Sequence, residues 1–214
     1  MRKTVLLSLL FFFTTGYSQT FDWWAQNVGW DGVSKWPRYI IYSPGYQGPT
    51  SLPVPHLSNG SIDSVNWAGI SSMFHFSKGD NTQNIKVTAN YCLVKDLISF
   101  DLNWVPAEWY QMDHATKTKR HVFHHFYYDN SATGDLILNT NIQLLNKWRD
   151  KIHLALRLGY RFPLGSGLGS ARYTDSPGYY FDLSAGKPLS PFWKLNAMIG
   201  FYSWQRNADH FFQN

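Results

Sequence analysis

Residues 134–162, GDLILNTNIQLLNKWRDKIHLALRLGYRF, decide the fold of this chain. From Leu136 to Leu144, most of the alternate side chains, starting with Leu136, are apolar, and most of the side chains between them are Asn or Gln. From Ile152 to Phe162 the same rhythm returns, with His, Ala, Arg and Gly between the apolar residues. Successive side chains of a β-strand point to opposite faces. Each run therefore predicts a ribbon with one apolar and one polar face.

Both runs are long enough to cross a bilayer when tilted, and a short polar turn, Asn146 to Asp150, joins them. Hairpins with an apolar lipid side and a polar lumen side are typical of outer-membrane barrels. The sequence predicts an all-β fold, an antiparallel transmembrane β-barrel. We expect it in the outer membrane of a Gram-negative bacterium.

The first nineteen residues have the pattern of a signal peptide. Arg2 and Lys3 form a basic region, Val5 to Phe13 an apolar region, and Gly16 and Ser18 are the small residues before a cleavage site. The apolar region is shorter than the roughly 20 residues that a spanning helix needs. We therefore predict a signal peptide over residues 1–19.

The composition agrees with a barrel. Aromatic residues make up 18% of the chain, with ten Trp and thirteen Tyr, and barrels use such residues as interface girdles. Without Arg2 and Lys3, the 19 basic residues become 17 against 14 acidic ones. This mild positive charge does not indicate a nucleic-acid partner. A single cysteine, Cys92, excludes an intramolecular disulfide and is expected to be a small buried or lumenal residue.

Residues 20–60 form a separate Trp/Pro/Gly-rich N-terminal segment. Its prolines lack the N–H donor that a central strand needs, although Tyr39 to Tyr42 could form one short edge strand. Two interpretations remain open. The segment is either a plug inside the lumen or an arm that its tryptophans pack under the rim of the barrel.

Residues 61–214 are assigned to the barrel, and the alternation predicts seven crossings. Loop lengths orient them, because bacterial barrels have short periplasmic turns and longer external loops. The short turns, at 95–96, 146–150 and 187–191, are placed in the periplasm. The long loops, Pro106–Thr133 and Pro163–Gly178, are placed outside. The predicted strands are 64–77, 84–94, 98–104, 136–144, 152–162, 179–186 and 193–204.

Seven crossings end outside, at Gln205, whereas single-chain bacterial barrels close with an even number of strands. Either the chain is truncated and shows the N-terminal part of a larger barrel, or Arg120–Tyr128 forms an eighth crossing. We favour truncation, because the second count places Pro163–Gly178 in the periplasm. The tail, 206–214, also lacks the terminal aromatic residue that often closes a barrel.

Few residues indicate chemistry. The loop histidines lack the frame of a metal site; they are His114, His121, His124 and His125. A Ser–His pair at the rim, His75 with Ser77, or His153, would be needed for a lipid hydrolase or acyltransferase. No spacing supports it. The glycine-rich residues 165–170 lack the Lys-Ser/Thr pair of a phosphate loop and are interpreted as a flexible external loop. We expect no enzyme, no metal and no cofactor.

The polar face of the strands provides the candidate functional residues. Charges at membrane depth must face water or one another. In a narrow eight-stranded barrel they would fill the interior, whereas in a wider one Lys86, Arg157 and Arg161 would form a cationic lining that favours anionic or polar solutes. The candidate lumen lining is Lys86, Asn90, Asp101, Asn103, Asn139, Asn141, Gln143, His153, Arg157, Arg161, Asp182 and Asn196.

Residues 134–204 resemble a known family. The segments GDLILNTNIQLL, LALRLGYRFPLGSG, YYFDLSAGKPL and WKLNAMIGFY are similar to outer-membrane barrels described as phenol-degradation meta-pathway transporter-like proteins. The signal that ends in YSQ is similar to those of Bacteroidota-type secreted proteins. The resemblance implies a roughly twelve-stranded barrel that passes small, aromatic or hydrophobic molecules, and no catalytic residues.

Two functions follow from these observations. The first is a passive, porin-like channel or transporter for a small solute, gated by residues 20–60. The second is a non-conducting structural or adhesive barrel that presents its external loops to partners. Either protein would be surrounded by outer-membrane lipid and inserted by the barrel-insertion machinery.

Overall fold

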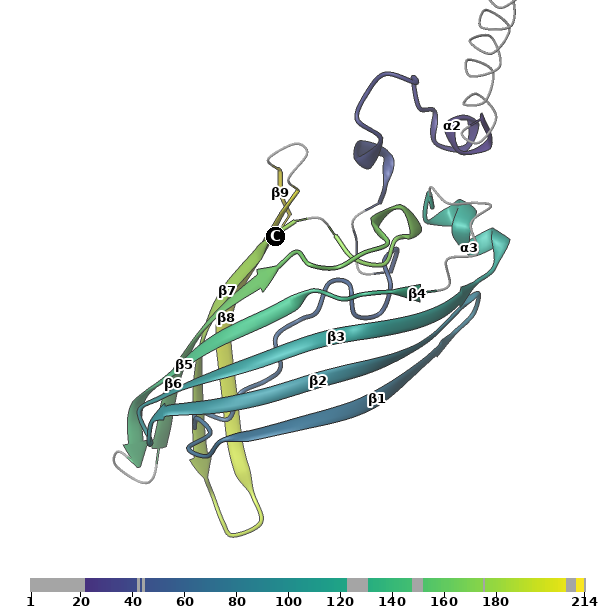
Figure 1. Ribbon diagram of the computed structural model, residues 1–214. Helices are drawn as coiled ribbons and strands as arrows, with labels where there is room; N and C mark the ends of the chain where they lie inside the picture. The colour runs from purple at the N-terminus through teal and green to yellow at the C-terminus, as the bar shows by residue number, and fades with distance from the viewer. Residues whose placement is uncertain are drawn as a thin grey trace, which may run out of the picture.

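The strands form one antiparallel sheet that curls into a half-barrel (Figure 1). The computed structural model describes residues 22–41, 43, 45–122, 131–147, 152–174, 176–206 and 211–213. The predicted signal peptide, residues 1–19, lies outside the described residues. The all-β antiparallel class is confirmed.

Seven long strands carry the sheet, as the alternation predicts. They follow the order β1-β2-β3-β5-β6-β7-β8, each antiparallel to its neighbours. Two short strands extend it: β4 (Ser131–Ala132) pairs with β3, and β9 (Phe211–Gln213) pairs with β8. The long strands are β1 (Trp67–Ser77), β2 (Asp80–Val94), β3 (Ile98–Met112), β5 (Leu136–Lys147), β6 (Ile152–Phe162), β7 (Gly178–Pro188) and β8 (Lys194–Arg206).

The short helices lie in the segments around the sheet. They are α2 (Asp22–Val28), the 3-10 turn η1 (Trp36–Tyr39), α3 (His114–Lys119) and the 3-10 turn η2 (Leu168–Ser170). None of the helices in the described part of the chain is long and apolar enough to span a bilayer.

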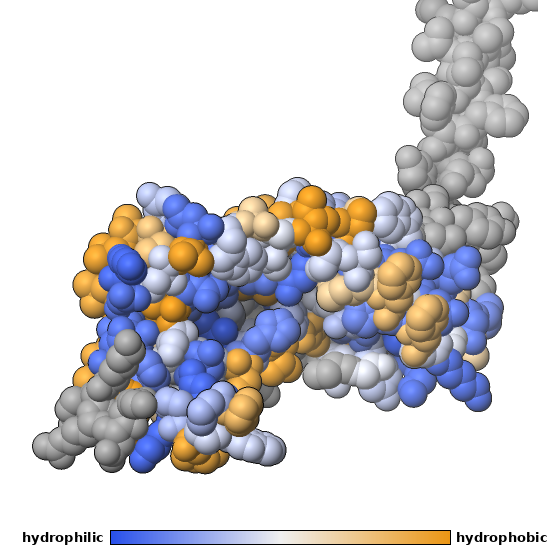
Figure 2. All heavy atoms as spheres, turned by 90° about the horizontal axis from the view of Figure 1, so that it is seen from below, coloured by the Kyte–Doolittle hydropathy of each residue, from blue (hydrophilic) through white to orange (hydrophobic). Residues whose placement is uncertain are grey.

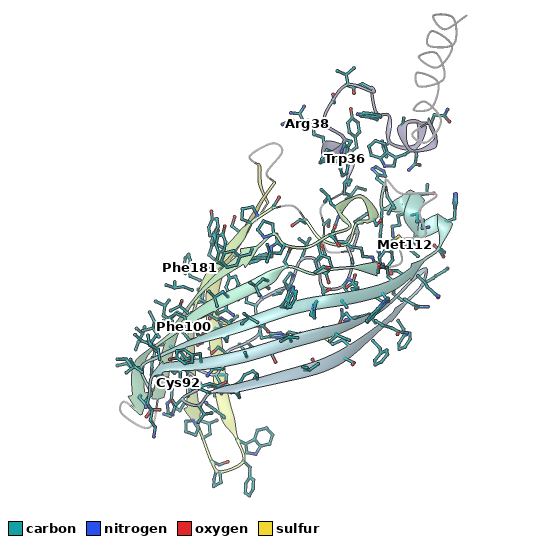
Figure 3. All side chains as sticks on the ribbon, in the orientation of Figure 1. Trp36, Arg38, Cys92, Phe100, Met112 and Phe181 are labelled. Carbon is teal, nitrogen blue, oxygen red and sulfur yellow. The ribbon has the colours of Figure 1, made fainter. Side chains whose placement is uncertain are left out.

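The two ends of the sheet differ, as the loop lengths predict. The turns β2–β3 and β7–β8 lie at one end, and the segments with α3 and η2 lie at the other (Figure 1). Figure 3 shows the same polarity, with Cys92 and Phe100 near the turn end and Met112 at the loop end. Most of the predicted turn 146–150 lies outside the described residues. We call the two ends the turn end and the loop end.

The prediction that β3 stops near Trp104 was wrong. The strand continues through Pro106 to Met112, so the long loop starts at Asp113. A β-bulge explains this. Val87 pairs with Trp104, whereas Ile85 pairs with Ala107, so β3 contains one extra residue between these pairs. A bulge tolerates proline, which has no N–H for the ladder.

One further local prediction was wrong. Tyr39 ends η1, in whose first turn Pro37 has a pre-set backbone angle, so no edge strand starts at Tyr39. The long loop begins with α3, which Asp113 caps by accepting the Thr116 N–H at 2.7 Å. Arg120 follows α3 and begins no strand. The rest of the predicted eighth crossing, from residue 123, lies outside the described residues.

The sheet is inverted relative to a soluble protein. Its convex face exposes apolar side chains, and its concave face buries polar ones. Figure 2 shows apolar side chains along the outer margin and hydrophilic ones around the hollow. Exposed on the convex face are Ile70, Phe74, Phe76, Leu138, Leu158, Phe181 and Ile199. Buried on the concave face are Thr82, Asn84, Asn90, Ser99, Asn139, Gln143, Arg161 and Asp182.

A conventional apolar core is found at the loop end. There the inward side chains of β3 pack under the loop that carries η2. The cluster comprises Tyr110, Met112, Val122, Ala132, Ala171 and Tyr173. It fixes the long loops on the end of the sheet.

Candidate functional site

Asp101 is the centre of a polar row that crosses the concave face. The register places it beside Asn90 on β2 and Asn139 on β5. Its carboxylate accepts hydrogen bonds from the side-chain amides of Asn139 at 2.7 Å, Asn141 at 2.7 Å and Asn103 at 3.0 Å. Four residues that the sequence places on the polar face thus form one hydrogen-bonded group.

Gly159 lets Tyr180 join this row. Gly159 stands between Asn139 and Tyr180 in the register. Because it has no side chain, the Tyr180 hydroxyl reaches across and donates to Asn139 Oδ1 at 2.5 Å. A Cβ at position 159 would lie 2.2 Å from the Tyr180 ring.

A second row lies next to the first. Arg157 on β6 faces Asp182 on β7, and its Nε donates to Asp182 Oδ2 at 2.7 Å. Arg157 Nη2 also donates to the backbone carbonyl of His56 at 2.7 Å. The same guanidinium thus joins the sheet to the N-terminal segment.

The N-terminal segment runs along the concave face from the loop end to the turn end. Arg161 donates to the Ser51 carbonyl at 3.0 Å, and Arg157 holds His56 further along. Gln143 then donates to the Gly60 carbonyl at 2.7 Å and accepts the Ile62 N–H at 3.0 Å. Residues 51–62 therefore occupy part of the concave space.

Gly60 lies very close to the sheet. Its φ is +77°, which favours glycine. A Cβ at this position would lie 2.5 Å from the backbone nitrogen of Gly186 on β7. Only a residue without a side chain fits between the segment and the strand.

Arg172 anchors the loop after β6 to the start of β2. Its side chain is fully buried, 2.5 Å from Asp80 and 3.3 Å from Glu108. It also donates to Thr82 at 2.9 Å and lies 3.7 Å from the centre of the Tyr110 ring. A buried guanidinium with two carboxylates and an aromatic face has the partners that its charge requires.

Tyr173 extends this cluster. Its hydroxyl donates to Glu108 at 2.9 Å and also contacts Thr50 of the N-terminal segment. Burial and the neighbouring Glu108 carboxylate raise the pKa of Tyr173, so the phenol keeps its proton. The cluster thus joins the loop, the sheet and the N-terminal segment.

Arg161 and Asp135 form a looser buried pair. Arg161 Nε lies 3.6 Å from Asp135 Oδ2, too far for a hydrogen bond. Burial raises the pKa of Asp135 to about 6, although Arg161 and the Gly165 N–H both oppose this change. The remaining donors of Arg161 bind Thr174 and the Ser176 carbonyl, so this guanidinium also holds the loop.

A cavity of about 570 Å³ lies between the rows and the N-terminal segment. Gln143 holds that segment, Asp182 pairs with Arg157, and His153 places its backbone carbonyl beneath Gly60. Asn196 is half-buried on β8. The other predicted candidates line the cavity: Lys86, Asn90, Asp101, Asn103, Asn139, Asn141, Arg157 and Arg161. Their role as the lining of a solute path stays a prediction.

The charged group at the loop end does not follow from the sequence pattern. Asp80 falls between two predicted strands and Glu108 in a predicted loop, and the bulge in β3 changes which residues face inward beyond Trp104. Arg172 lies in the predicted external loop Pro163–Gly178, just after the glycine-rich residues 165–170. This part of the loop is packed, because Gly169, Ser170, Ala171, Arg172, Tyr173 and Thr174 are all buried.

Two of the residues considered for catalysis and metal binding contact backbone carbonyls. Ser77 Oγ donates to the Asp80 carbonyl at 2.6 Å, and His121 Nδ1 lies 2.9 Å from the Tyr39 carbonyl. His124 and His125 lie outside the described residues. Within the described ranges, no group of three or more His, Cys, Asp or Glu side chains could hold a metal ion. Cys92 is free and half-buried.

Comparisons with protein-family models, with curated proteins and with solved structures give no match for this chain.

Proposed function

We propose that this protein is an outer-membrane β-barrel through which small solutes cross passively. The observation that carries the proposal is the inverted sheet, with apolar side chains exposed on the convex face and polar side chains buried on the concave face. A water-soluble protein rarely exposes a contiguous apolar patch of more than a few hundred Å². Lipid is the surrounding that suits such a face.

The height of the apolar band supports this environment. On β2 the outward side chains are polar at Asn81 and Gln83 and become apolar from Ile85 to Leu93. Nine residues at about 3.3 Å each, tilted by about 40°, span about 23 Å. Outer-membrane barrels have an apolar band about 25 Å tall. Asn81 and Gln83, on the loop-end side of Ile85, would then lie in water.

The N-terminal segment would act as the constriction of the channel. Residues 51–62 lie on the concave face, held by Arg161, Arg157 and Gln143. This location favours the plug over the arm for that part of the segment. Because a strand edge is costly in lipid, the proposal also requires that β1 pair with a further strand, as in the larger barrel expected from the sequence.

Single-channel recording in planar bilayers tests this proposal. The matched variant replaces residues 50–58 by a Gly/Ser linker of equal length, which removes the prolines that stiffen the constriction. We expect current from the native protein and a larger conductance from the variant. Absence of current from both proteins at every voltage would contradict the channel.

A non-conducting barrel that presents its loops to partners is the second candidate. The packed loop end favours it, because Arg172 and Tyr173 hold the loop after β6 in one conformation against β2 and β3. An ordered surface suits recognition better than a loose one. Specific binding to cells or matrix by a protein that carries no current would favour this candidate.

A further inference from the structure

The charges around the cavity neutralise one another. Arg157 pairs with Asp182 at 2.7 Å, and Arg161 lies 3.6 Å from Asp135. Both guanidinium groups also hold backbone carbonyls of the N-terminal segment. The cationic lining expected from the sequence is therefore not available to attract an anion.

The remaining charges also balance. Lys86 makes no ion pair with any residue that the structure describes, and it lines the same cavity as Asp101. A third charged side chain, Asp63, lines the exposed edge of the cavity, where it accepts the Trp67 N–H. One ammonium and one carboxylate thus remain inside and leave the interior of the cavity close to neutral. A neutral site gives no electrostatic advantage to a solute of either sign.

The amides around Asp101 have a defined orientation. An ionised carboxylate can only accept hydrogen bonds, so the amide nitrogens of Asn103 and Asn141 must face it. Their carbonyl oxygens then point away from Asp101 and remain available as acceptors. The Lys86 ammonium adds donors to the same cavity.

One indole ring completes the lining. Trp67 stands beside Asn90 in the register, on the concave face, and lines the cavity. Its N–H donates to Asp63 at 3.0 Å. Because this polar tip is engaged, the side chain offers the cavity only apolar ring surface.

We propose that this cavity binds a neutral polyhydroxylated solute of the carbohydrate class. Hydroxyl groups both donate and accept, which matches amide oxygens beside an ammonium. The C–H face of a sugar ring packs on an indole ring. The volume of about 570 Å³ lies within the usual range for small-molecule sites. This inference rests on the proposed channel function and names its solute.

Three sugars of one ring size test the inference: glucose, glucuronate and glucosamine. Liposomes with the purified full-length chain are mixed with each sugar, and the rate of swelling is measured. We expect glucose to enter several-fold faster than either charged sugar. Faster entry of glucuronate, or equal rates for all three, would overturn the inference while leaving a channel.

Binding is measured separately, by titrating tryptophan fluorescence of the detergent-solubilised protein with glucose. Binding without swelling would support the site and overturn the channel. Neither binding nor swelling would overturn both. Asn141→Leu should weaken glucose binding about 2- to 10-fold, as expected for one lost hydrogen bond. The matched exchange Asn81→Leu, on the outward face, should leave glucose binding unchanged.

Lys86→Met gives a readout that a purely structural role would not change. It leaves the Asp101 charge uncompensated, so glucosamine should then enter faster than glucuronate. Unchanged relative rates for the two charged sugars would overturn the role of Lys86 in the charge balance.

Discussion

Gly159 and Tyr180 are matched residues on neighbouring strands. The missing side chain of Gly159 leaves the space that the Tyr180 ring occupies, and the Tyr180 hydroxyl there reaches Asn139. The glycine of β6 thus serves the polar row through Asp101 and not a turn. This relationship links backbone register directly to the chemistry of the interior.

Gly159→Ala should destabilise the sheet. Its Cβ would lie 2.2 Å from the Tyr180 ring and 2.6 Å from Asn139 Oδ1, so the hydrogen bond between them must break or shift. We expect a loss of about 1–3 kcal/mol in the free energy of unfolding, measured by urea titration in detergent. Gly69→Ala is the control, because its Cβ would meet Thr88 at an ordinary 3.4 Å. Equal free energies of unfolding for the two variants would contradict the close packing of the Tyr180 ring against Gly159.

Arg172→Met should release the loop after β6. The exchange leaves Asp80 and Glu108 buried with less compensation, which costs about 3–5 kcal/mol. We expect faster proteolysis within residues 163–177. Arg120→Met removes a partly exposed partner of the same Asp80 and should have a smaller effect. Cleavage of the two variants at the same rate would show that Arg172 is not the anchor.

Asp135 should make stability depend on pH. Its pKa rises from 3.8 to about 6 on folding, because burial disfavours the carboxylate. The folded state binds the proton more tightly, so the stabilisation is complete below pH 3.8 and is lost as the pH rises through about 6. A difference of two pKa units corresponds to about 3 kcal/mol.

Asp135→Asn should remove this pH dependence and keep the acceptor for the Gly165 N–H. Urea titrations at pH 4 and pH 7 measure it. The exposed Asp96, in the β2–β3 turn, provides the control exchange Asp96→Asn, which should keep the native dependence. If the free energy of unfolding of Asp135→Asn falls between the two pH values by as much as that of the native chain, the buried carboxyl is not the source of the pH dependence.

Gln143→Leu should loosen the N-terminal segment at the turn end. The side chain bonds both the Gly60 carbonyl and the Ile62 N–H, and losing them leaves backbone groups unpaired in a buried place. Hydrogen exchange at residues 58–62 should accelerate. Gln83→Leu, on the outward face of β2, is the matched control. Unchanged protection at residue 62 would contradict the contact.

The alternation of apolar and polar residues in the sequence predicts much of the fold. Apolar and polar residues alternate at most positions from Leu136 to Leu144 and from Ile152 to Phe162, so strand positions and faces follow from local chemistry. The polar partners around Asp101 lie on the predicted face for the same reason. The lengths of the connecting segments also predict that the turns β2–β3 and β7–β8 share one end of the sheet, and the side of the membrane on which that end lies stays a prediction.

The charged group at the loop end could not be predicted in the same way. The bulge near Pro106 changes which residues of β3 face inward, and no local sequence pattern predicts the bulge. The partners of Arg172, Asp80 and Glu108, are 92 and 64 residues away along the chain. Their contact depends on register across several strands, which single-residue preferences do not specify.

Depth-dependent quenching at Ile199 and Met198 tests most directly that the convex face meets lipid. These neighbours on β8 point to opposite faces; Ile199 is 76% exposed, while Met198 contacts Arg157. Each is replaced by cysteine in a Cys92→Ser background, labelled with a fluorophore and placed in bilayers with brominated acyl chains. We predict strong quenching at position 199 and weak quenching at position 198. Equal quenching at both positions, or none at 199, would contradict the account.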